Sequence, residues 1–394
     1  MTTTSVHMNL LEEEEMVATK DWRKALRAQP AYRVVNRTIR GQTLFTWTVG
    51  LTGLFFLIYF YTNSTTRSTS SVLRSSDYNY TYPLTRPIKT SNMHRFRIGI
   101  IADLDTNSKS DKEKNTWISY FKTGYLSYNP QKKSVTVAWD PKEPEVLKTS
   151  FSLKGRGCEL SELVTFNGKL LTFDDRTGIV FEIVKNNIVP WVMLMDGDGQ
   201  NEKGFKSEWA TVKDEVLYVG SMGKEWTTAT GDFVNNNPQY VKMIDTKGTV
   251  LHVNWVEEYK RIREILGIHW PGYMLHESGI WSSVHKRWFF LPRRCSKEPY
   301  NEILDERKGC SVLISADRDM HDVKYVEITN SRATRGFSSF KFVPTSDDHV
   351  IVALRTEEVE GSTATYVTAF TVDGEILLDD IFVADAKYEG FEFI

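Results

Sequence analysis

The chain has 394 residues, enough for one large domain or two of medium size. Hydrophobic residues make up 41% and charged residues 25%, which excludes a disordered, collagen-like or multi-span membrane protein. The 49 lysines and arginines nearly balance the 51 aspartates and glutamates, so the net charge of -2 gives no reason to expect a nucleic acid as partner. Three cysteines exclude a disulfide framework, and no cysteine or histidine cluster indicates zinc.

One segment near the N-terminus departs from this average. Residues 43–62 read TLFTWTVGLTGLFFLIYFYT, about the 20 residues that a helix needs to cross a bilayer. Six basic residues within 21–40 precede it, so the positive-inside rule places the N-terminus in the cytosol. No small-residue cleavage pattern follows, which favours a signal anchor; a buried core helix is the alternative. We therefore predict a cytosolic tail over 1–42 and a membrane-spanning helix over 43–62 of a single-pass type II protein.

The segment after this helix is expected to be a luminal stalk. Residues 63–76 are rich in serine and threonine and poor in apolar residues, as flexible linkers are. Asn79-Tyr80-Thr81 is a sequon for N-glycosylation. We predict a stalk over 63–90 and a folded domain over 91–394, and proteolysis of the stalk would release a secreted form.

From residue 97 onward the pattern is that of short strands and turns. Segments rich in valine, isoleucine and aromatic residues alternate with turn sequences such as NG, DD and DG. Only residues 256–266, VEEYKRIREIL followed by Gly267, show convincing helical periodicity. The folded domain is therefore predicted to be all-β. The expected strands are 97–104, 134–140, 169–174, 179–184, 216–221, 288–292, 350–355 and 366–372.

A weak internal repeat suggests how these strands are arranged. Hairpin-like segments recur at residues 166–175, 212–221, 284–293 and 345–355. A residue with a side-chain oxygen precedes each by a few positions and a fifth lies near the C-terminus, at intervals of 47 to 69 residues. Five such units predict a five-bladed β-propeller, closed by pairing of strand 97–104 with the C-terminal strands; a jelly roll or double sandwich is the competing architecture. The five residues are Ser161, Glu208, Glu277, Ser338 and Glu389.

In a propeller, equivalent positions of the innermost strands converge on the central channel. Three carboxylates and two hydroxyls would meet there, and like charges in one funnel repel each other unless a cation holds them. Oxygen ligands without histidine or cysteine suit Ca²⁺ better than zinc, and a wide ring suits Ca²⁺ better than Mg²⁺. The spacing therefore predicts Ca²⁺ as the metal.

Several longer runs carry a resemblance to a known family. They include IADLDTNS (101–108), KGRGCELSEL (154–163), EKGFKSEW (202–209), YVGSMGKEWTT (218–228), GYMLHES (272–278), RGFSSFKF (335–342) and KYEGFEFI (387–394). Together they resemble the calcium-activated nucleotidase, or apyrase, family over about residues 78–394. The resemblance implies a five-bladed propeller with a central Ca²⁺ that hydrolyses nucleoside di- and triphosphates, with UDP and GDP preferred over ADP.

The resemblance also assigns metal ligands by position. Ser161, Glu208, Glu277, Ser338 and Glu389 match the family's calcium ligands, in agreement with the ring deduced from the spacing. Position 162 is often aspartate in relatives and is the longer Glu162 here. We include Glu162 among the expected metal ligands, although this substitution departs from the family pattern.

Hydrolysis of a terminal phosphate needs an oriented water and positive side chains around the phosphate. Asp103 and Asp105 end a predicted strand and project to the same side, so we expect them to orient water or to hold calcium-bound water. Without the resemblance, two such carboxylates would more simply belong to a turn.

Basic and aromatic residues in the matching runs are candidates for binding the nucleotide. Arg176, Lys224 and Arg293, with its neighbour Arg294, are expected to bind phosphate, because arginine contacts two oxygens at once. Surface salt bridges are the alternative interpretation. Trp226 is expected to stack on the base, and Glu159 to accept a hydrogen bond from the base or ribose.

Some features remain open at this level. Cys295 and Cys310 form either a luminal disulfide or two free thiols. The DGDG run at 196–199 resembles half of a calcium loop but lacks the later glutamate, so it is read as a turn. A calcium-stabilised propeller that only binds a partner is the alternative to an enzyme. We expect the protein in the endoplasmic reticulum or Golgi membrane, with the folded domain luminal, and a homodimer is compatible with the sequence.

Overall fold

The computed structural model describes residues 31–34, 37–40, 49–57 and 77–394. The chain divides into two units, Met1–Val72 and Leu73–Ile394. In the first, β1 (Ala31–Val34) pairs antiparallel with β2 (Arg37–Arg40), and residues 49–57 are helical.

The predicted membrane-spanning helix is covered only in part by these residues. Its remaining residues, 43–48 and 58–62, lie outside the described ranges. Among the described residues, no helix combines the length and the apolar character that a bilayer crossing requires. The anchor therefore stays a prediction.

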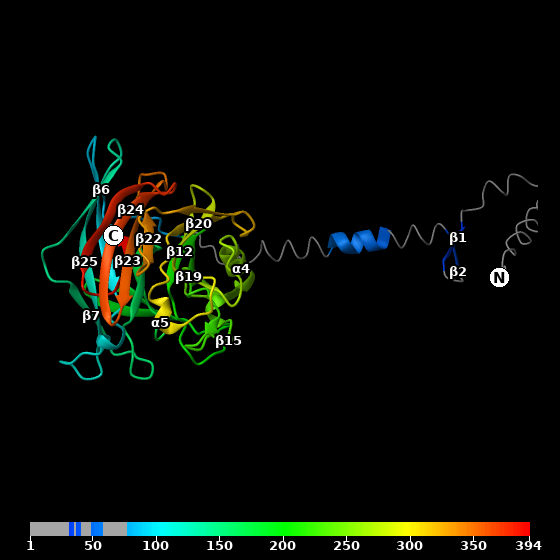
Figure 1. Ribbon diagram of the computed structural model, residues 1–394, viewed down its shortest axis with the longest axis horizontal. Coiled ribbons are helices and arrows are strands. Elements are labelled where there is room, and N and C mark those ends of the chain that lie inside the picture. Colours follow the sequence, from blue (N-terminus) through cyan, green and yellow to red (C-terminus); the bar gives the residue numbers. More distant parts are fainter. Residues whose placement is uncertain (1–30, 35–36, 41–48, 58–76) are drawn as a thin grey trace, which may run out of the picture. The chain divides into compact units, whose positions relative to one another are not determined.

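The second unit is a five-bladed β-propeller, as the repeat predicted (Figure 1). Each blade is a four-stranded antiparallel sheet that begins with its innermost strand. Each innermost strand packs against those of the two neighbouring blades, so they surround a central channel. The innermost strands of blades one to five are β8 (Leu160–Phe166), β12 (Trp209–Lys213), β18 (Tyr273–Ser282), β22 (Arg335–Phe342) and β26 (Tyr388–Phe393).

The other strands follow in chain order toward the outside of each blade. Blade one continues with β9 (Lys169–Asp174), β10 (Ile179–Val184) and β11 (Asn187–Met193), and blade two with β13 (Val216–Gly220), β16 (Tyr240–Ile244) and β17 (Val250–Asn254). Blade three continues with β19 (Arg287–Ser296), β20 (Val312–Ala316) and β21 (Val323–Glu327), and blade four with β23 (Val350–Val359), β24 (Ser362–Thr371) and β25 (Ile376–Ala384).

The fifth blade closes the ring with strands from both ends of the unit. The C-terminal β26 pairs with β4 (His94–Ala102), which continues to β5 (Trp117–Asn129) and β6 (Ser134–Trp139). The predicted closure of strand 97–104 against the C-terminus is thus confirmed. Two short strands, β3 (Ile88–Lys89) and β7 (Glu145–Thr149), pair with β4 and β5 at the edges.

Part of the predicted stalk contacts the propeller. Besides β3, the Tyr82 hydroxyl donates to Glu392 of β26 (3.1 Å). Asn79 of the sequon is exposed.

Three short insertions interrupt this pattern in and between blades two and three. The hairpin of β14 (Trp226–Thr227) and β15 (Phe233–Asn235) leaves blade two after β13, followed by the 3-10 turn η2 (Asn237–Gln239). Helix α4 (Val256–Glu264) lies where helical periodicity was predicted, and α5 (Glu302–Asp305) forms one short turn after β19.

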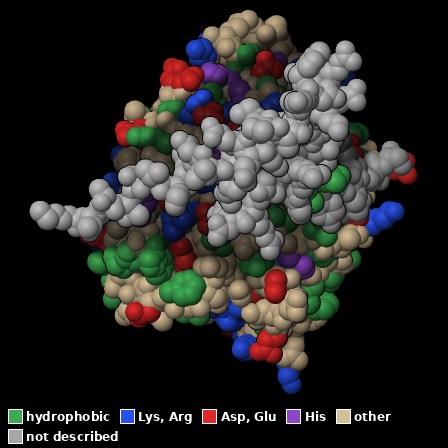
Figure 2. Space-filling model, turned by 90° about the vertical axis from the view of Figure 1, so that its right-hand side faces the viewer, with side chains coloured by type: hydrophobic (Ala, Val, Ile, Leu, Met, Phe, Trp, Pro, Cys, Tyr) green, Lys and Arg blue, Asp and Glu red, His purple; other side chains and the backbone are tan. Residues whose placement is uncertain are grey.

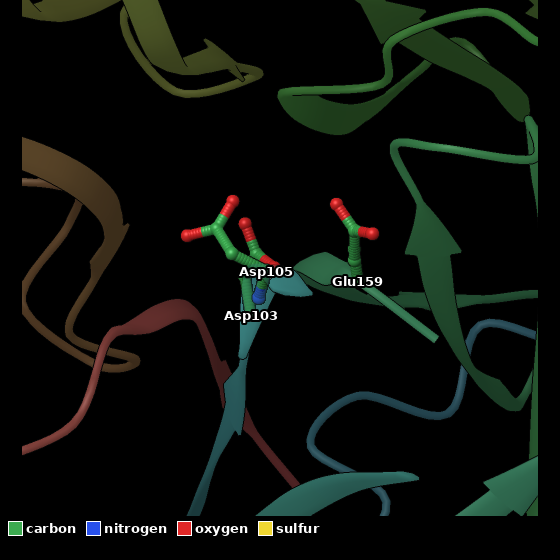
Figure 3. A group of neighbouring side chains, drawn as sticks. All are labelled: Asp103, Asp105 and Glu159. Carbon is green, nitrogen blue, oxygen red and sulfur yellow. Dashed lines mark hydrogen bonds between the residues drawn. The ribbon is translucent and has the colours of Figure 1, made fainter. Parts of the chain in front are cut away.

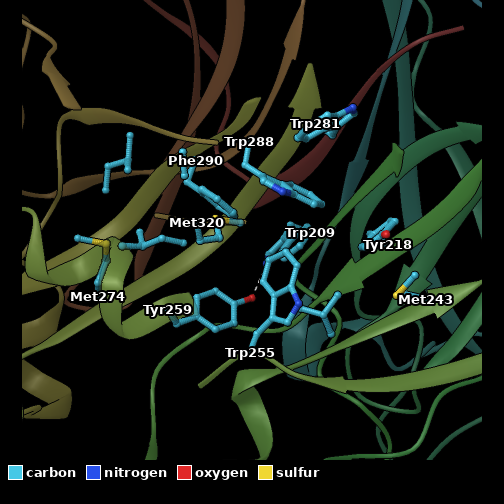
Figure 4. Packing of buried hydrophobic residues seen from close by; sticks show 14 of the residues in the cluster. Trp209, Tyr218, Met243, Trp255, Tyr259, Met274, Trp281, Trp288, Phe290 and Met320 are labelled. Carbon is cyan, nitrogen blue, oxygen red and sulfur yellow. Dashed lines mark hydrogen bonds between the residues drawn. The ribbon is translucent and has the colours of Figure 1, made fainter. Parts of the chain in front are cut away.

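The core lies between the blades, and one aromatic cluster joins blades two and three (Figure 4). Trp209 of β12 is fully buried there against Trp255, Trp288 and Phe290. Its cross-strand neighbour is Gly220, at which a Cβ atom would lie 2.0 Å from the indole, so only glycine leaves room for the ring.

The visible face in Figure 2 has acidic and basic side chains interspersed, in keeping with the small net charge.

Candidate active site and metal centre

Four of the five residues predicted to meet in the channel lie at β-bulges. In β8, β18, β22 and β26 the pairing with the neighbouring strand shifts its register at the same relative place. A bulge leaves a residue out of the ladder and redirects its side chain, and bulges are frequent beside active sites. The residues at these four bulges are Ser161, Glu277, Ser338 and Glu389.

Glu208 completes the set without a bulge. It directly precedes β12, and its backbone N–H donates to the carbonyl of Gly220 (2.8 Å). The exposed fractions of the five residues range from 0% to 9%. Glu277 raises the pKa of both Glu208 and Glu389 electrostatically, so the three carboxylates lie close together.

Burial of these carboxylates disfavours their charged forms. Desolvation raises the pKa of Glu208 to about 8 and that of Glu389 well above its usual range. Neighbouring cations offset part of this cost. The Arg293 guanidinium contacts Glu277 and lies 2.7 Å from Glu389, and the Lys206 ammonium lies 2.7 Å from Glu208.

The donor chemistry of this ring fits Ca²⁺. Three carboxylates and two hydroxyls are all hard oxygen donors, and Ca²⁺ accepts six to eight such ligands in flexible arrangements. A buried group of mutually repelling carboxylates is also the environment in which a divalent cation most lowers the electrostatic energy.

A second carboxylate group lies where β4 ends and before β8 begins (Figure 3). Asp103, Asp105 and Glu159 each offer an oxygen within 4.8 Å of the others, and the figure shows their carboxylates extending to the same side. Asp105 opens the 3-10 turn η1 (Asp105–Ser108), and its backbone N–H donates to Asp103 (2.8 Å). The predicted pair of aspartates is therefore joined by a third carboxylate.

Two cations hold this group together. Lys387 lies 2.7 Å from Asp103 and 3.2 Å from Asp105, while Arg156 makes two hydrogen bonds with Glu159 (2.5 and 2.8 Å). Burial acts against the charged form of Asp103, but Lys387 outweighs it and lowers the pKa of that carboxyl. Burial raises the pKa of Glu159 to about 7, so this group can exchange a proton near neutrality.

A pocket of about 540 Å³ opens beside these carboxylates. Its walls contain four residues predicted for catalysis or substrate binding: Asp105, Glu159, Arg176 and Trp226. The pocket is connected to the ring through Lys206, which lines it and pairs with Glu208.

Arg176 stands out among the cations of this pocket. It follows β9 in the turn DDRTG, where the backbone N–H groups of Arg176 and Thr177 donate to Asp174. Its guanidinium makes no hydrogen bond or ion pair with any residue that the structure describes, and its Nε is buried. A buried donor without a partner is costly, so this side chain is arranged to receive an anion.

Comparisons with known proteins agree with this geometry. The apyrase family model matches residues 104–394. The chain belongs to the apyrase family. It is 53% identical over 321 residues to soluble calcium-activated nucleotidase 1 of Rattus norvegicus, covering 82% of this chain and 79% of that protein. It is 49% identical over 317 residues to an apyrase of Cimex lectularius (80% and 87% covered) and 42% identical over 301 residues to apyrase apy-1 of Caenorhabditis elegans (76% and 84% covered).

Besides Asp103 and the five ring residues, three predicted site residues lie outside the pocket walls. The Glu162 carboxylate turns to Ser339 (3.1 Å) and Lys341 (3.3 Å), because it is next to the bulged Ser161 in a strand whose side chains alternate. Lys224 donates to the Glu225 carbonyl (3.0 Å) and lies over the Tyr300 ring (4.3 Å). Arg293 is buried among ring carboxylates and also contacts Glu358 (2.6 Å).

The sequence argument missed several charged residues that lie beside the predicted ones. Arg156, Lys203, Lys206 and Asp175 line the pocket, and Lys387 bridges the aspartates. All but one of these residues lie in or beside the runs KGRGCELSEL, EKGFKSEW and KYEGFEFI, whose charged residues are the signal that could have indicated them. Asp175 lies in the turn DDRTG.

The cysteine alternatives are also resolved in this apyrase. Cys295 of β19 and Cys310 form a disulfide with a Cα–Cα distance of 5.4 Å, and Cys158 is free and buried.

Proposed function

We propose that the protein hydrolyses nucleoside diphosphates, with UDP and GDP preferred over ADP, and nucleoside triphosphates, releasing phosphate in a calcium-dependent reaction. Hydrolysis of nucleotide phosphates and dependence on Ca²⁺ follow from membership of a family whose relatives are called apyrase and calcium-activated nucleotidase. The base preference rests on the resemblance found in the sequence. The observation that carries the proposal is that the ring of carboxylates and hydroxyls lies next to a pocket with cationic walls. Lys206 connects the two, because it lines the pocket and pairs with Glu208 of the ring.

The ring residues have the role of holding the metal. Ca²⁺ held by Ser161, Glu208, Glu277, Ser338 and Glu389 would supply a Lewis acid that polarises phosphoryl oxygens. Glu162 contributes at most indirectly in this assignment, since its carboxylate is bound to Lys341.

Phosphate binding is assigned to the cations of the pocket. Arg176 supplies a free guanidinium for two phosphate oxygens, and Lys206 adds a positive charge next to the ring. These charges stabilise the leaving phosphate when the bond between its bridging oxygen and the terminal phosphorus breaks. Trp226, half-buried in the pocket wall, offers an apolar face to the base.

The carboxylates beside the pocket are assigned to the attacking water. Asp103 and Asp105 are held at the end of β4 by Lys387 and orient a water molecule toward the terminal phosphorus. Glu159, with a pKa of about 7, is suited to exchange the proton that this water loses.

The proposed place of action is the lumen of the endoplasmic reticulum or Golgi. The apolar, uncharged run at 43–62 after a basic segment supports a type II anchor, and hydrolysis of UDP there would remove an inhibitory product of glycosyltransferases. Cleavage before the propeller releases a secreted form. An exposed sequon at Asn79 is compatible with luminal glycosylation.

The activity is tested by phosphate release from UDP, GDP, ADP and UTP, with the full chain in calcium, in magnesium and in chelator. We expect release from diphosphates in calcium alone, and its loss in Glu208→Gln with the unfolding transition retained. A folded protein that binds calcium and releases no phosphate would instead be a binding module.

The location is tested separately by expressing the full chain in cells. We expect a glycosidase to shift its mobility, an Asn79→Gln variant to lose that shift, and the propeller to resist protease in sealed microsomes. A propeller digested in sealed microsomes contradicts the proposed topology.

A further inference from the structure

Lys203 is the one pocket cation that lies over the indole of Trp226. Its Nζ is 4.0 Å from the ring centroid. The ammonium makes no hydrogen bond with any residue in the described ranges, and its side chain is 39% exposed. A partly desolvated ammonium without an acceptor, beside the aromatic face assigned to the base, is positioned to receive a hydrogen-bond acceptor of the substrate.

The DGDG run explains why Lys203 lies there. Asp196, its first residue, is buried and accepts a hydrogen bond from the Asn237 amide (3.0 Å). Its carboxylate is 3.8 Å from the Lys203 ammonium, close enough for attraction but too far for a hydrogen bond. The backbone N–H of Asp196 also donates to the Lys203 carbonyl (2.9 Å). The run is therefore a turn that anchors Lys203.

The contacts of the pocket cations distinguish a phosphate-binding end of the pocket from a base-binding end. Lys206 pairs with Asp175 and Glu208, and Arg156 with Glu159 and Asp105, so both face the ring and the carboxylate group. Lys203 contacts only Asp196 and Trp226 among the described side chains. A diphosphate bound at Lys206, beside the ring, leaves the base at the Lys203 side.

We infer that Lys203, anchored by Asp196, selects nucleotides whose base has a keto oxygen next to a ring N–H, as in uracil, guanine and hypoxanthine. This inference rests on the proposed function, because it assigns the base end of the same pocket. The flexible stem of lysine lets its ammonium move to the edge of the indole when a base stacks there. The ammonium then donates to O4 of uracil or O6 of a purine.

The same geometry disfavours cytosine and adenine. These bases have an amino group in place of the keto oxygen, so two donors would face each other and the ammonium would stay unpaired. An unpaired charged donor in a partly buried site lowers affinity more than a missing apolar contact does. A hydrogen bond to a charged group corresponds to a preference of roughly tenfold or more.

The test uses two nucleotide pairs that differ only at this position of the base. UDP is compared with CDP, and IDP with ADP, by kcat/KM in the full-length wild-type protein and in Lys203→Met. Lys154→Met is the matched control, because it removes a second lysine from the same pocket wall. A further variant, Asp196→Asn, weakens the anchor while leaving Lys203 in place.

We expect a preference of about tenfold for UDP over CDP and for IDP over ADP in the wild type. Lys203→Met is expected to bring both ratios close to one, Asp196→Asn to lower them partly, and Lys154→Met to leave both ratios unchanged. Ratios that do not change in Lys203→Met, or an equal loss on all four nucleotides, overturn the inference while the hydrolysis itself stands. A wild type that releases phosphate from none of them overturns the proposed function instead.

Discussion

The aromatic cluster between blades two and three and the central channel are stabilised in different ways, although the same strands supply both. In β12, Trp209 points into the cluster with no exposed surface, while the preceding residue, Glu208, belongs to the ring. In β18, Trp281 likewise belongs to the cluster and Glu277 to the ring. The cluster consists of apolar and aromatic residues, and the Trp209 indole N–H donates a hydrogen bond to the Tyr259 hydroxyl (3.2 Å). The channel buries carboxylates that depend on Arg293, Lys206 and Lys387 for compensation.

This difference separates the residues that hold the propeller together from those that act. Burial of apolar surface stabilises the blades at every pH and in every metal concentration. Buried charges contribute little net stability even when they are paired, because desolvation offsets their attraction. We therefore expect metal binding in the channel to change activity more than the stability of the fold.

Trp209→Ala is expected to have the largest effect on stability. It removes the indole that touches Trp255, Trp288 and Phe290 and leaves a cavity, at a cost of about 3–5 kcal/mol in the free energy of unfolding. Chemical denaturation measures this loss of unfolding free energy. Trp226→Ala in the pocket wall is the matched control and should change nucleotide affinity with little loss of stability. Equal destabilisation by both changes would contradict the division between core and channel.

The pH dependence of stability distinguishes the buried charged groups of the innermost strands from the apolar core. Burial raises the pKa of Glu162 to about 7 in the folded protein, from an ordinary value of 4.5. The folded state therefore binds this proton more tightly, so the stabilisation is complete below pH 4.5 and is lost as the pH rises through 7. Glu162→Gln should reduce this loss by roughly 3 kcal/mol or less.

Unfolding free energies at pH 4.5 and pH 8 in chelator measure the change. Glu113→Gln, a matched change at a carboxylate paired with Lys148 at the surface, should leave the slope as in the wild type. A slope that Glu162→Gln does not alter would show that folding does not raise the pKa of this carboxyl.

The calcium requirement of the activity distinguishes carboxylates in the ring from carboxylates next to it. Glu277→Gln removes one of the three carboxylate charges proposed to bind calcium and should raise the calcium concentration for half-maximal activity by roughly 100-fold. Glu358→Gln is the control, since Glu358 also contacts Arg293 but is not one of the five ring residues. We expect a change of no more than about threefold there. Similar shifts in both variants would mean that general charge, rather than ligation, sets the calcium requirement.

The sequence predicted the propeller because its evidence is local and repeated. Strand patterns and turns recur along the chain, with an oxygen-bearing residue a few positions before each of four hairpins and a fifth near the C-terminus. Four of these five residues lie at bulges in equivalent places. The grouping of Asp105, Glu159, Arg176 and Trp226 in one pocket also agrees with their predicted roles, which await experiment.

The remaining contacts could not be predicted because they depend on long-range packing. Lys387 reaches Asp103 from 284 positions away, and no periodicity marks such a pair. Lys224 and Arg293 have the charge expected of phosphate ligands, but whether they point into a pocket or into a blade depends on register shifts that composition does not reveal. Lys203 became a candidate for binding the base only because the fold places it over Trp226.

The smallest expected effect concerns Arg176, whose guanidinium has no hydrogen-bond partner among the described residues and is assigned to phosphate rather than to the base. Arg176→Gln should lower kcat/KM by roughly tenfold for UDP, GDP and ADP alike, because all three present the same diphosphate. Its unfolding free energy should stay unchanged, since the guanidinium has no ion pair to lose among the described residues. Arg176→Lys should recover part of the activity through its charge but not the two-oxygen contact. A base-dependent loss would move Arg176 to the base end of the pocket, and a loss of stability would make it part of the scaffold.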